Sequence, residues 1–412
     1  MKRIFKPGNL LSVLLILLFT MPLIECQSKE KLPPYNNPTG DEFPIMAWYS
    51  FRPAELVNKK NFLIMREAGF NITQTLTNQN IVDLTLEAVK GTGVKVMVNC
   101  AQTRNPETIP AALKKYRNNP DVAGYFINDE PSASKFEKLH IISESLREND
   151  PDRIVFVNFF PIINPKRLEA RNYETYIKDG VTKIGLPLFS YDNYPLTLNK
   201  NGKIKISDTF YENLEIALKI SKSLNRPFWA FCMSSQHYDF AYPSEACLSF
   251  EAFSALAYGA QGLSYYTYVK KDDINPQYLN APVNPDGSTT DIWESAKKIN
   301  TKIHALEKIF LGCKVIEVRH TGKIPQKTKS LKKLPKPFKS IQTEEAGVLV
   351  SHLQNNGNDY LIIVNHEVER FQKINLETSG SIYRLSAENG EEKIFNGGSL
   401  NLEPGGFAIF KW

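Results

Sequence analysis

The chain has 412 residues, more than one compact hydrophobic core usually organises, so a large domain and a smaller one are expected. Hydrophobic residues make up 42% of it and aromatic residues 11%, a composition that indicates a globular protein and excludes a disordered one. The formal net charge is +6, but seven lysines lie between Lys323 and Lys339 with no acid among them. The basicity is therefore local; it indicates a solvated loop and gives no support to nucleic-acid binding.

The first 40 residues resemble an export signal followed by a tether. Three basic residues among the first six precede an apolar run, residues 10–24, that is too short for a lasting transmembrane helix. Leu23-Ile24-Glu25-Cys26 resembles a bacterial lipobox, in which the cysteine is lipidated. We expect a signal peptide with lipobox in residues 1–26, a tether in residues 27–40, and a cell-envelope protein, periplasmic or surface-facing, held on the membrane by a lipid at Cys26. Ordinary secretion is the alternative.

From residue 43 to residue 311, short apolar strands alternate with helical segments. The predicted strands span residues 43–49, 71–75, 94–98, 122–127, 154–157, 183–189, 228–232 and 263–268. The predicted helices lie near residues 54–68, 81–90, 109–116, 136–146, 168–178, 210–223, 246–258 and 292–310. Eight strand–helix pairs in about 270 residues match an α/β protein of the (β/α)8 TIM-barrel type, over residues 41–312. A doubly wound open sheet is disfavoured because no glycine-rich phosphate loop follows the first strand.

The sequence changes in character after Gly312. Short strands are predicted at residues 347–352, 360–365, 382–386 and 407–410, separated by Asn-Gly, Ser-Gly and Pro-Gly-Gly turns. We therefore expect a small C-terminal antiparallel β-sandwich over residues 313–412. It is interpreted as a packing partner of the barrel or as a carbohydrate-binding accessory domain.

The reacting groups of a barrel enzyme lie at the carboxyl ends of the strands. Acids occur at only two of these predicted ends: Asp129 and Glu130 follow the fourth strand, and Asp192 follows the sixth. An acid–base mechanism therefore has to use these three carboxylates or a residue from a loop. They are the candidate catalytic residues.

The same strand ends carry aromatic and amide side chains. Aromatic rings can stack on the apolar faces of sugar rings, and amides and acids can bind the hydroxyls, so this rim suits a carbohydrate. The candidate substrate-binding residues are Trp48, Tyr49, Asn99, Asn128, Asn158, Tyr191, Tyr194, Gln236, Tyr265 and Tyr266.

Other kinds of site have little support in the sequence. His237 is the only histidine at a predicted strand end, and there is neither an HExxH ligand motif nor a GxSxG nucleophile elbow, so we expect no metal site and no cofactor. Besides Cys26 there are four cysteines without CxxC spacing, which are expected to be buried free thiols: Cys100, Cys232, Cys247 and Cys313. The oligomeric state is not predicted.

Each candidate also has an ordinary structural interpretation. Asp129 and Glu130 could simply favour the start of the following helix, and the stretch from Tyr191 to Pro195 could be a turn. The tyrosines of the eighth strand could belong to the core. The functional interpretation is favoured because these features fall at the ends of strands four, six and eight together.

Three stretches resemble the retaining barrel glycosidases, and in particular the family 42 β-galactosidases. Residues 126–131, Phe-Ile-Asn-Asp-Glu-Pro, resemble the strand-four motif in which an asparagine precedes the acid/base glutamate; here Asp129 takes the place of that asparagine. Residues 189–195 resemble the Ser-Trp-Asp-x-Tyr-Pro motif of strand six, and residues 226–229 with 257–266 resemble strands seven and eight. The resemblance implies that Glu130 is the acid/base. The family's strand-seven nucleophile is absent, because Cys232 occupies its position.

The adjacent Asp129-Glu130 pair also resembles hexosaminidases of families 20 and 123. There the substrate's own 2-acetamido oxygen attacks the anomeric carbon, the aspartate orients that group, and the glutamate protonates the leaving oxygen. Tyr191-Asp192 is similar to the Tyr-Asp pair of family 18 chitinases, which helps to hold the acetamido group. An inverting mechanism would instead pair Glu130 with Asp192, about 6.5–9.5 Å apart.

The sequence therefore predicts an exported glycoside hydrolase that acts on oligo- or polysaccharides with Glu130 as general acid/base. Burial and the Asp129 charge are expected to raise the pKa of Glu130. The alternative from another class is a carbohydrate-binding barrel that has lost its nucleophile and does not catalyse.

Overall fold

The computed structural model describes residues 32–74, 79–163, 165–271 and 276–412. The residues from Leu32 onward form one compact unit. The predicted signal peptide, the lipobox with Cys26 and the first part of the tether lie outside the described residues. In the ranges given above, no helix is long and apolar enough to cross a membrane.

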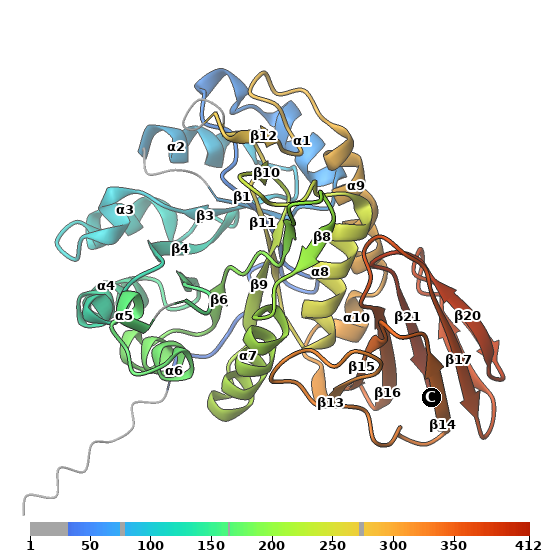
Figure 1. The fold of residues 1–412 in the computed structure, drawn as a ribbon. Coiled ribbons are helices and arrows are strands. Elements are labelled where there is room, and N and C mark those ends of the chain that lie inside the picture. Colours follow the sequence, from blue (N-terminus) through green and yellow to red (C-terminus); the bar gives the residue numbers. More distant parts are fainter. Residues whose placement is uncertain (1–31, 75–78, 164, 272–275) are drawn as a thin grey trace, which may run out of the picture. The chain divides into compact units, whose positions relative to one another are not determined.

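Eight parallel strands close into a barrel, as predicted (Figure 1). Around the barrel, each strand is hydrogen-bonded to the next in the order β1-β2-β3-β4-β5-β6-β9-β11. Their bounds are β1 (Ile45–Trp48), β2 (Ile72–Gln74), β3 (Lys95–Val98), β4 (Val122–Asp129), β5 (Ile154–Phe159), β6 (Phe189–Tyr191), β9 (Phe228–Met233) and β11 (Leu263–Tyr266). We call the carboxyl-terminal end of these strands the mouth of the barrel and their amino-terminal end the base. The predicted sixth strand began too early, because residues 183 and 184 still belong to a helix.

Helices follow the strands and cover the outside of the barrel (Figure 1). They are α1 (Lys59–Glu67), α2 (Gln79–Ala88), α3 (Ile109–Tyr116), α4 (Phe136–Asn149), α5 (Pro165–Leu168), α6 (Tyr173–Ile184), α7 (Phe210–Leu224), α8 (Glu245–Ala257), α9 (Asp291–Ala305) and α10 (Glu307–Phe310), with short 3-10 turns at Ala54–Leu56, Ala101–Arg104 and Ala133–Lys135. Local sequence sets several ends. Before α6, the side chain of Asn172 accepts the N–H of Thr175, and Gly185 ends the helix with a φ of 76°.

Strand residues alternate between the barrel interior and the helical layer. The interior is filled by large apolar side chains such as Trp48, Phe126 and Phe231. The Trp48 ring packs edge-on against Phe126, 5.1 Å away, and against Phe231, 5.0 Å away. Only 1% of Trp48 is exposed. The prediction that Trp48 stacks on substrate is therefore wrong: it is a packing residue of the barrel interior.

The C-terminal residues form two antiparallel sheets, as predicted. The larger sheet has the order β13-β15-β16-β21-β18-β19 and the smaller β14-β17-β20. The bounds are β13 (Lys314–His320), β14 (Phe338–Thr343), β15 (Val348–Asn355), β16 (Asn358–Asn365), β17 (Gln372–Thr378), β18 (Ile382–Leu385), β19 (Glu392–Phe395), β20 (Gly398–Leu402) and β21 (Phe407–Lys411). The seven lysines of the predicted solvated loop are exposed; six lie between β13 and β14, and Lys339 belongs to β14.

Strands β15 and β16 are buried on both faces. Leu349, Leu353 and Ile362 pack into the same hydrophobic cluster as the barrel's helical layer, whereas Val350 and Ile363 pack between the two sheets. Strands covered on both sides have nearly continuous apolar sequences, which is why this part of the chain was easily predicted. On the barrel side these strands contact α8, which is buried along almost its whole length.

Two short ribbons lie outside the barrel sheet. One pairs β10 (Gln236–His237) with β12 (Tyr278–Asn280), and the other pairs β7 (Leu196–Leu198) with β8 (Ile204–Ile206). Both follow strands at their carboxyl ends, so they belong to the mouth. Neither ribbon was predicted from the sequence.

Candidate active site

The parallel register brings the predicted acids of strands four and six to the two sides of Asn158. Asp129 of β4 pairs with Asn158 of β5, which pairs in turn with Ser190 of β6. The Asn158 side chain donates from Nδ2 to Asp129 Oδ1 at 3.0 Å, and Ser190 Oγ donates to Asn158 Oδ1 at 3.3 Å. Asp192 follows at the end of β6. Asn158, predicted to bind substrate, therefore orients the Asp129 carboxylate.

Glu130 has an unusual backbone conformation. Its φ is 45°, in the left-handed region that a residue with a side chain seldom adopts. Its N–H donates to the backbone oxygen of Asn158 at 2.8 Å, and the next carbonyl, that of Pro131, accepts from Tyr176 Oη at 2.6 Å. The register of β4 also shifts between Phe126 and Asn128, which redirects the end of the strand. Strain of this kind gathers at functional sites, where the surrounding contacts maintain it.

The electrostatics of Glu130 suit a general acid. Burial and the neighbouring Asp129 charge raise the pKa of Glu130 to about 7, although Arg167 acts against this shift. The Arg167 guanidinium is 3.9 Å from Glu130 Oε2, and the Glu130 side chain is 32% exposed, so solvent can reach it. A carboxyl group with a pKa near 7 can hold its proton at neutral pH and release it during a reaction.

The other two acids differ in their surroundings. Burial raises the pKa of Asp129, but the hydrogen bond from Asn158 and the positive charge of Lys271 lower it again. Burial, followed by the charges of Glu130 and Asp129, raises the pKa of Asp192 well above its usual value. Because only Asp129 has both a donor and a cation, it should ionise first. Asp192 has no cation among the causes that act on it, so its ionised form is disfavoured.

Several buried polar atoms around these acids have no hydrogen-bond partner among the residues that the structure describes. Buried polar groups are almost always paired, so such a cluster indicates a place for the hydroxyls or amides of a ligand. The atoms are Gln74 Oε1, Asn99 Oδ1, Asn128 Oδ1, Asp192 Oδ1 and Tyr194 Oη. Four of these five residues were candidates from the sequence; Gln74, which ends β2, was not among them.

An aromatic group lies beside the acids. The rings of Tyr49 and Tyr194 lie 5.8 and 5.5 Å from that of Tyr266, and the Tyr266 and Tyr278 hydroxyls are 2.5 Å apart. The Lys271 ammonium is 3.9 Å from the centroid of the Tyr49 ring and donates to Tyr266 Oη at 3.3 Å. Tyr49, Tyr194 and Tyr266 were predicted. Lys271 and Tyr278 were missed, since nothing local marks them as neighbours of a strand end.

The β10–β12 ribbon holds this group from outside. The His237 ring stacks on Tyr278 at 4.4 Å, and Asn280 Nδ2 donates to Gln236 Oε1 at 2.8 Å. Gln236, a predicted substrate-binding residue, thus has a structural partner in the ribbon. The long-range pairing of residues 236 and 280 could not be read from local sequence.

Tyr191 and Tyr265 do not reach the mouth. Tyr191 stacks on Phe228 at 6.3 Å and Tyr265 meets the edge of Phe70 at 5.1 Å, and both are buried in the cluster shared with the helical layer. Their predicted role in substrate binding is wrong, because neighbouring residues of a strand point to opposite faces. If Asp192 points into the barrel, Tyr191 must point away.

The seventh strand offers no carboxylate at the position suggested by the glycosidase resemblance. Cys232 is fully buried among the residues of the helical layer. Behind the strand, Glu251 of α8 accepts the N–H of Met233 at 2.8 Å, and burial raises the pKa of Glu251 to about 8. Cys100, Cys232, Cys247 and Cys313 are free thiols, as expected, although Cys313 is only partly buried. Within the described ranges, no group of three His, Cys, Asp or Glu side chains could hold a metal ion.

No protein-family model matches the chain, and no curated protein matches its sequence. Solved structures do match its fold. A β-galactosidase from Bacillus circulans sp. alkalophilus has a TM-score of 0.61 at 9% identity, covering 93% of this chain and 99% of that one. A family 5 glycoside hydrolase from Bacteroides vulgatus ATCC 8482 has 0.56 at 11%, covering 90% and 88%.

A third neighbour is a polyextremophilic β-galactosidase from the haloarchaeon Halorubrum lacusprofundi, with a TM-score of 0.53 at 11% identity, covering 90% of this chain and 99% of that one. Identities this low show the fold alone. The predicted resemblance is confirmed at that level: the chain has the TIM-barrel fold of glycoside hydrolases.

Proposed function

We propose that this protein is a glycoside hydrolase and that Glu130 is its general acid/base. The observation that carries the proposal is Glu130 itself, a carboxyl group with a pKa of about 7, in a strained conformation at the carboxyl end of a barrel strand. The fold and the unpartnered polar atoms of the mouth support a carbohydrate as the substrate.

The surroundings of the three acids favour substrate-assisted catalysis. In this mechanism Asp129, which accepts a hydrogen bond from Asn158 and whose ionised form the Lys271 charge favours, accepts the N–H of a 2-acetamido group and orients its oxygen towards the anomeric carbon. The acetamido oxygen then bonds to the anomeric carbon to give an oxazolinium ion, while the bond from that carbon to the glycosidic oxygen breaks and Glu130 gives its proton to the leaving oxygen. Water then attacks the anomeric carbon, and the bond from that carbon to the acetamido oxygen breaks. The Glu130 carboxylate takes a proton from the attacking water.

The inverting alternative requires Asp192 to act as a base. The raised pKa of Asp192 opposes that role, because a general base has to be ionised before it can take a proton from water. The retaining alternative requires a second carboxylate about 5 Å from Glu130, and β9 does not supply one. The absence of a carboxylate on β9 also favours the second candidate function, a carbohydrate-binding barrel without catalytic activity.

Glu130→Gln is the test of the proposal. The variant keeps the size of the side chain but cannot donate the proton, so kcat on natural glycosides should fall about 10²–10⁴-fold. Aryl glycosides with and without a 2-acetamido group would be compared, since only the former should be hydrolysed by a substrate-assisted enzyme. Glu137→Gln, on an exposed residue at the start of α4, is the matched control.

Hydrolysis by Glu130→Gln at the wild-type rate would refute the assignment of Glu130. Calorimetry with oligosaccharides beside the activity assay separates the two candidate functions. Binding by the wild-type protein without any product would favour the non-catalytic barrel.

We also propose that the protein is exported and anchored through a lipid on Cys26. The lipobox-like sequence and the preceding apolar run support this proposal. Replacing Cys26 by Ser should abolish labelling of the protein with a radioactive fatty acid. Labelling that persists in this variant would contradict the proposal.

A further inference from the structure

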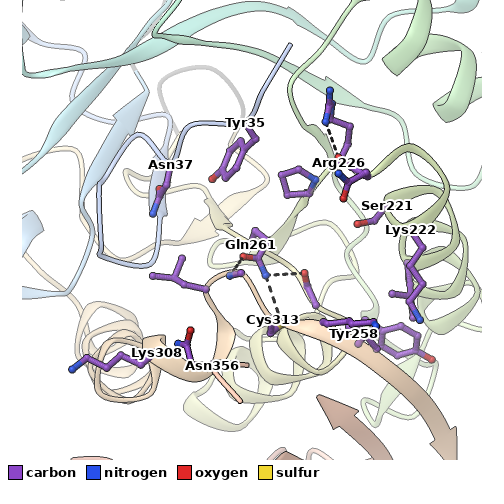
Figure 2. A pocket seen from close by; sticks show the side chains of 18 of the residues that line it. Tyr35, Asn37, Ser221, Lys222, Arg226, Tyr258, Gln261, Lys308, Cys313 and Asn356 are labelled. Carbon is purple, nitrogen blue, oxygen red and sulfur yellow. Dashed lines mark hydrogen bonds between the residues drawn. The ribbon is translucent and has the colours of Figure 1, made fainter. Parts of the chain in front are cut away.

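A charged cavity lies at the base of the barrel, at the end opposite to the candidate active site. Its volume is about 900 Å³, and its lining includes residues just before β9 and β11, which places it at the amino ends of these strands. Four cations line it and only one acid, Asp41, does so; Figure 2 shows Lys222, Arg226 and Lys308 around it, and the fourth is Lys314.

The positive charge continues along β13. Burial and the charges of Lys314 and Arg319 lower the pKa of Lys222, so Lys222 lies close enough to both cations to be repelled by them. Arg319 also lines a second cavity, of about 440 Å³, together with three lysines of the lysine-rich loop. We call this whole set the basic face: Lys222, Arg226, Lys308, Lys314, Arg319, Lys329, Lys332 and Lys333.

Few acids oppose the basic face. In the part of the chain that the structure describes, the acids that line its cavities or act on its cations are Asp41, Glu215 and Glu317. Of the described acids, only Glu317 forms an ion pair there, with Arg319. Eight cations against three acids leave a large excess of positive charge, and six of the eight, all lysines, are exposed. A surface of this kind attracts a polyanion.

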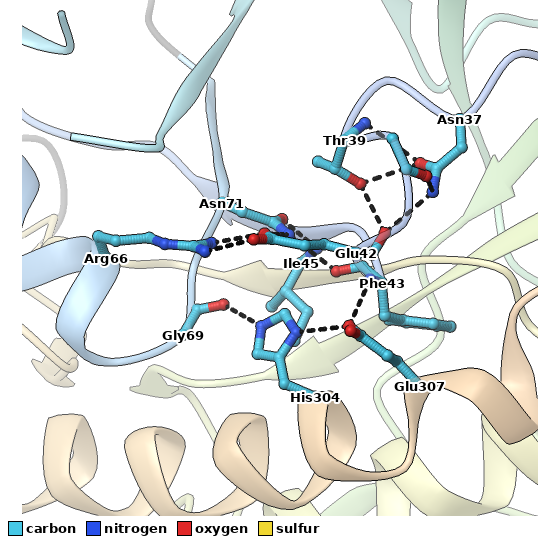
Figure 3. A network of polar contacts seen from close by, with 11 residues as sticks. Asn37, Thr39, Glu42, Phe43, Ile45, Arg66, Gly69, Asn71, His304 and Glu307 are labelled. Carbon is cyan, nitrogen blue, oxygen red and sulfur yellow. Dashed lines mark hydrogen bonds and ion pairs between the residues drawn. The ribbon is translucent and has the colours of Figure 1, made fainter. Parts of the chain in front are cut away.

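The amino-terminal segment reaches the barrel at the same place. Figure 3 shows how it is fixed: Glu42 forms two hydrogen bonds with Arg66, at 2.6 and 2.8 Å, and the Phe43 N–H donates to Glu307 at 2.9 Å. Nearer the start of the chain, Arg226 Nη2 donates to the Leu32 oxygen at 2.5 Å. An arginine of the basic face therefore binds the first described residue.

Cys26 precedes Leu32 by only six residues. A stretch of six residues spans at most about 20 Å. A lipid on Cys26 would hold Leu32, and with it Arg226, within about that distance of the membrane. This step rests on the proposed lipid anchor.

We propose that the basic face docks onto the surface of a bilayer that contains anionic lipids. The short tether keeps this face close to the membrane, and the lysines then bind the negatively charged headgroups. Docking at the base leaves the mouth directed away from the bilayer, where a polysaccharide can reach Glu130. A tether of this length without a docking surface would leave the mouth in any orientation.

Vesicle binding tests the proposal without the lipid. The chain that begins at Gln27 retains the whole compact unit from Leu32 to Trp412 and carries no acyl group. It should sediment with vesicles of phosphatidylglycerol and phosphatidylcholine but not with phosphatidylcholine alone, and about 0.5 M salt should release it. Equal binding to both kinds of vesicle, or none at low salt, would overturn the proposal.

A pair of double variants locates the binding surface. The double variant Lys222→Gln, Lys314→Gln removes two charges that repel each other, so the fold should tolerate it, and it should weaken vesicle binding at least about tenfold. Neutralising Lys59 and Lys60 to Gln makes the same change in net charge at the start of α1 and should leave binding unaltered. Equal weakening by both variants would mean that net charge alone, and not this face, is responsible.

Two further readouts separate the other outcomes. If an acidic polysaccharide such as polygalacturonate binds the basic face while vesicles do not, the face recognises a polymer and the membrane proposal is wrong. Hydrolysis of aryl glycosides by the same variants should remain at the wild-type rate. If neither the wild-type protein nor any variant hydrolyses the glycosides, the proposed hydrolase function is wrong. The result of the vesicle-binding experiment does not depend on that outcome.

Discussion

The two ends of the barrel shift the pKa of a glutamate side chain in opposite directions. At the base, Glu42 has a guanidinium and an amide as partners, and these contacts lower the pKa of its carboxyl group. At the mouth, burial and the adjacent Asp129 charge raise the pKa of the Glu130 carboxyl group to about 7, and the ion pair with Arg167 at 3.9 Å does not offset them. A paired carboxylate stabilises the fold. An incompletely paired one is available for chemistry.

Of the changes that test this difference between the two ends, Asp129→Asn should have the largest effect on activity. The amide cannot accept the acetamido N–H as the carboxylate does, so kcat on 2-acetamido glycosides should fall about 10²-fold. Asp121→Asn, on the residue just before the other end of the same strand, is the control and should keep its activity. Steady-state kinetics with aryl substrates would measure both. An unchanged kcat in the Asp129 variant would remove the orienting role.

The pH profile of the wild-type enzyme comes next. Glu130 must be protonated to act as the acid, and its pKa is about 7, so kcat/KM should fall about tenfold per unit as the pH rises above 7. The low residual activity of Glu130→Gln should lack this decline. A profile that stays flat to pH 9 would show that Glu130 does not titrate in the productive complex.

Arg66→Ala should affect stability and not turnover. It removes both hydrogen bonds to Glu42, and because the pair is partly exposed the loss should be about 1 kcal/mol. Urea denaturation would show this as a lower midpoint. Lys90→Ala breaks an exposed pair with Glu87 on the surface and should cost less. A loss of kcat in the Arg66 variant would mean that the base and the mouth are coupled.

Lys271→Gln should give the smallest change. The Lys271 charge lowers the pKa of Asp129, so its removal should raise that pKa and move the acidic limb of the kcat/KM profile to higher pH. At low pH, where Asp129 becomes protonated, the variant should be less active than the wild type. At intermediate pH, between the acidic and the basic decline of kcat/KM, its activity should approach that of the wild type. Lys270→Gln serves as the control. A shift of the limb to lower pH would contradict the assignment of Asp129 as the group that must be ionised.

Local pattern predicted the barrel well and its site in part. The eight apolar runs and the acids that follow two of them are local features, so Asp129, Glu130 and Asp192 could be found from sequence. The alternation of side chains along a strand already predicts that Tyr191 and Asp192 point to opposite faces, so only one of them can face the barrel interior. The contribution of Lys271 could not be foreseen, because it depends on a charge acting across the mouth from a different loop.

The sandwich shows the same limit. Strands β15 and β16 were predicted because both of their faces are buried, whereas β17 and β20 were missed. In β17 only Gln372, Ile374 and Leu376 are buried, and polar residues stand between them. Such a strand becomes recognisable only when its partners are known.

Helix α8 has a consequence for how this protein can be divided. It is apolar on every side because the barrel covers one face and the sheet that contains β15 and β16 covers the other, and the rings of Phe253 and Phe407 stack across that contact. A chain cut at Gly312 would leave this helix uncovered and prone to aggregate. The C-terminal sheets are thus no interchangeable module. In evolution and in expression trials alike, the two parts should be kept or lost together.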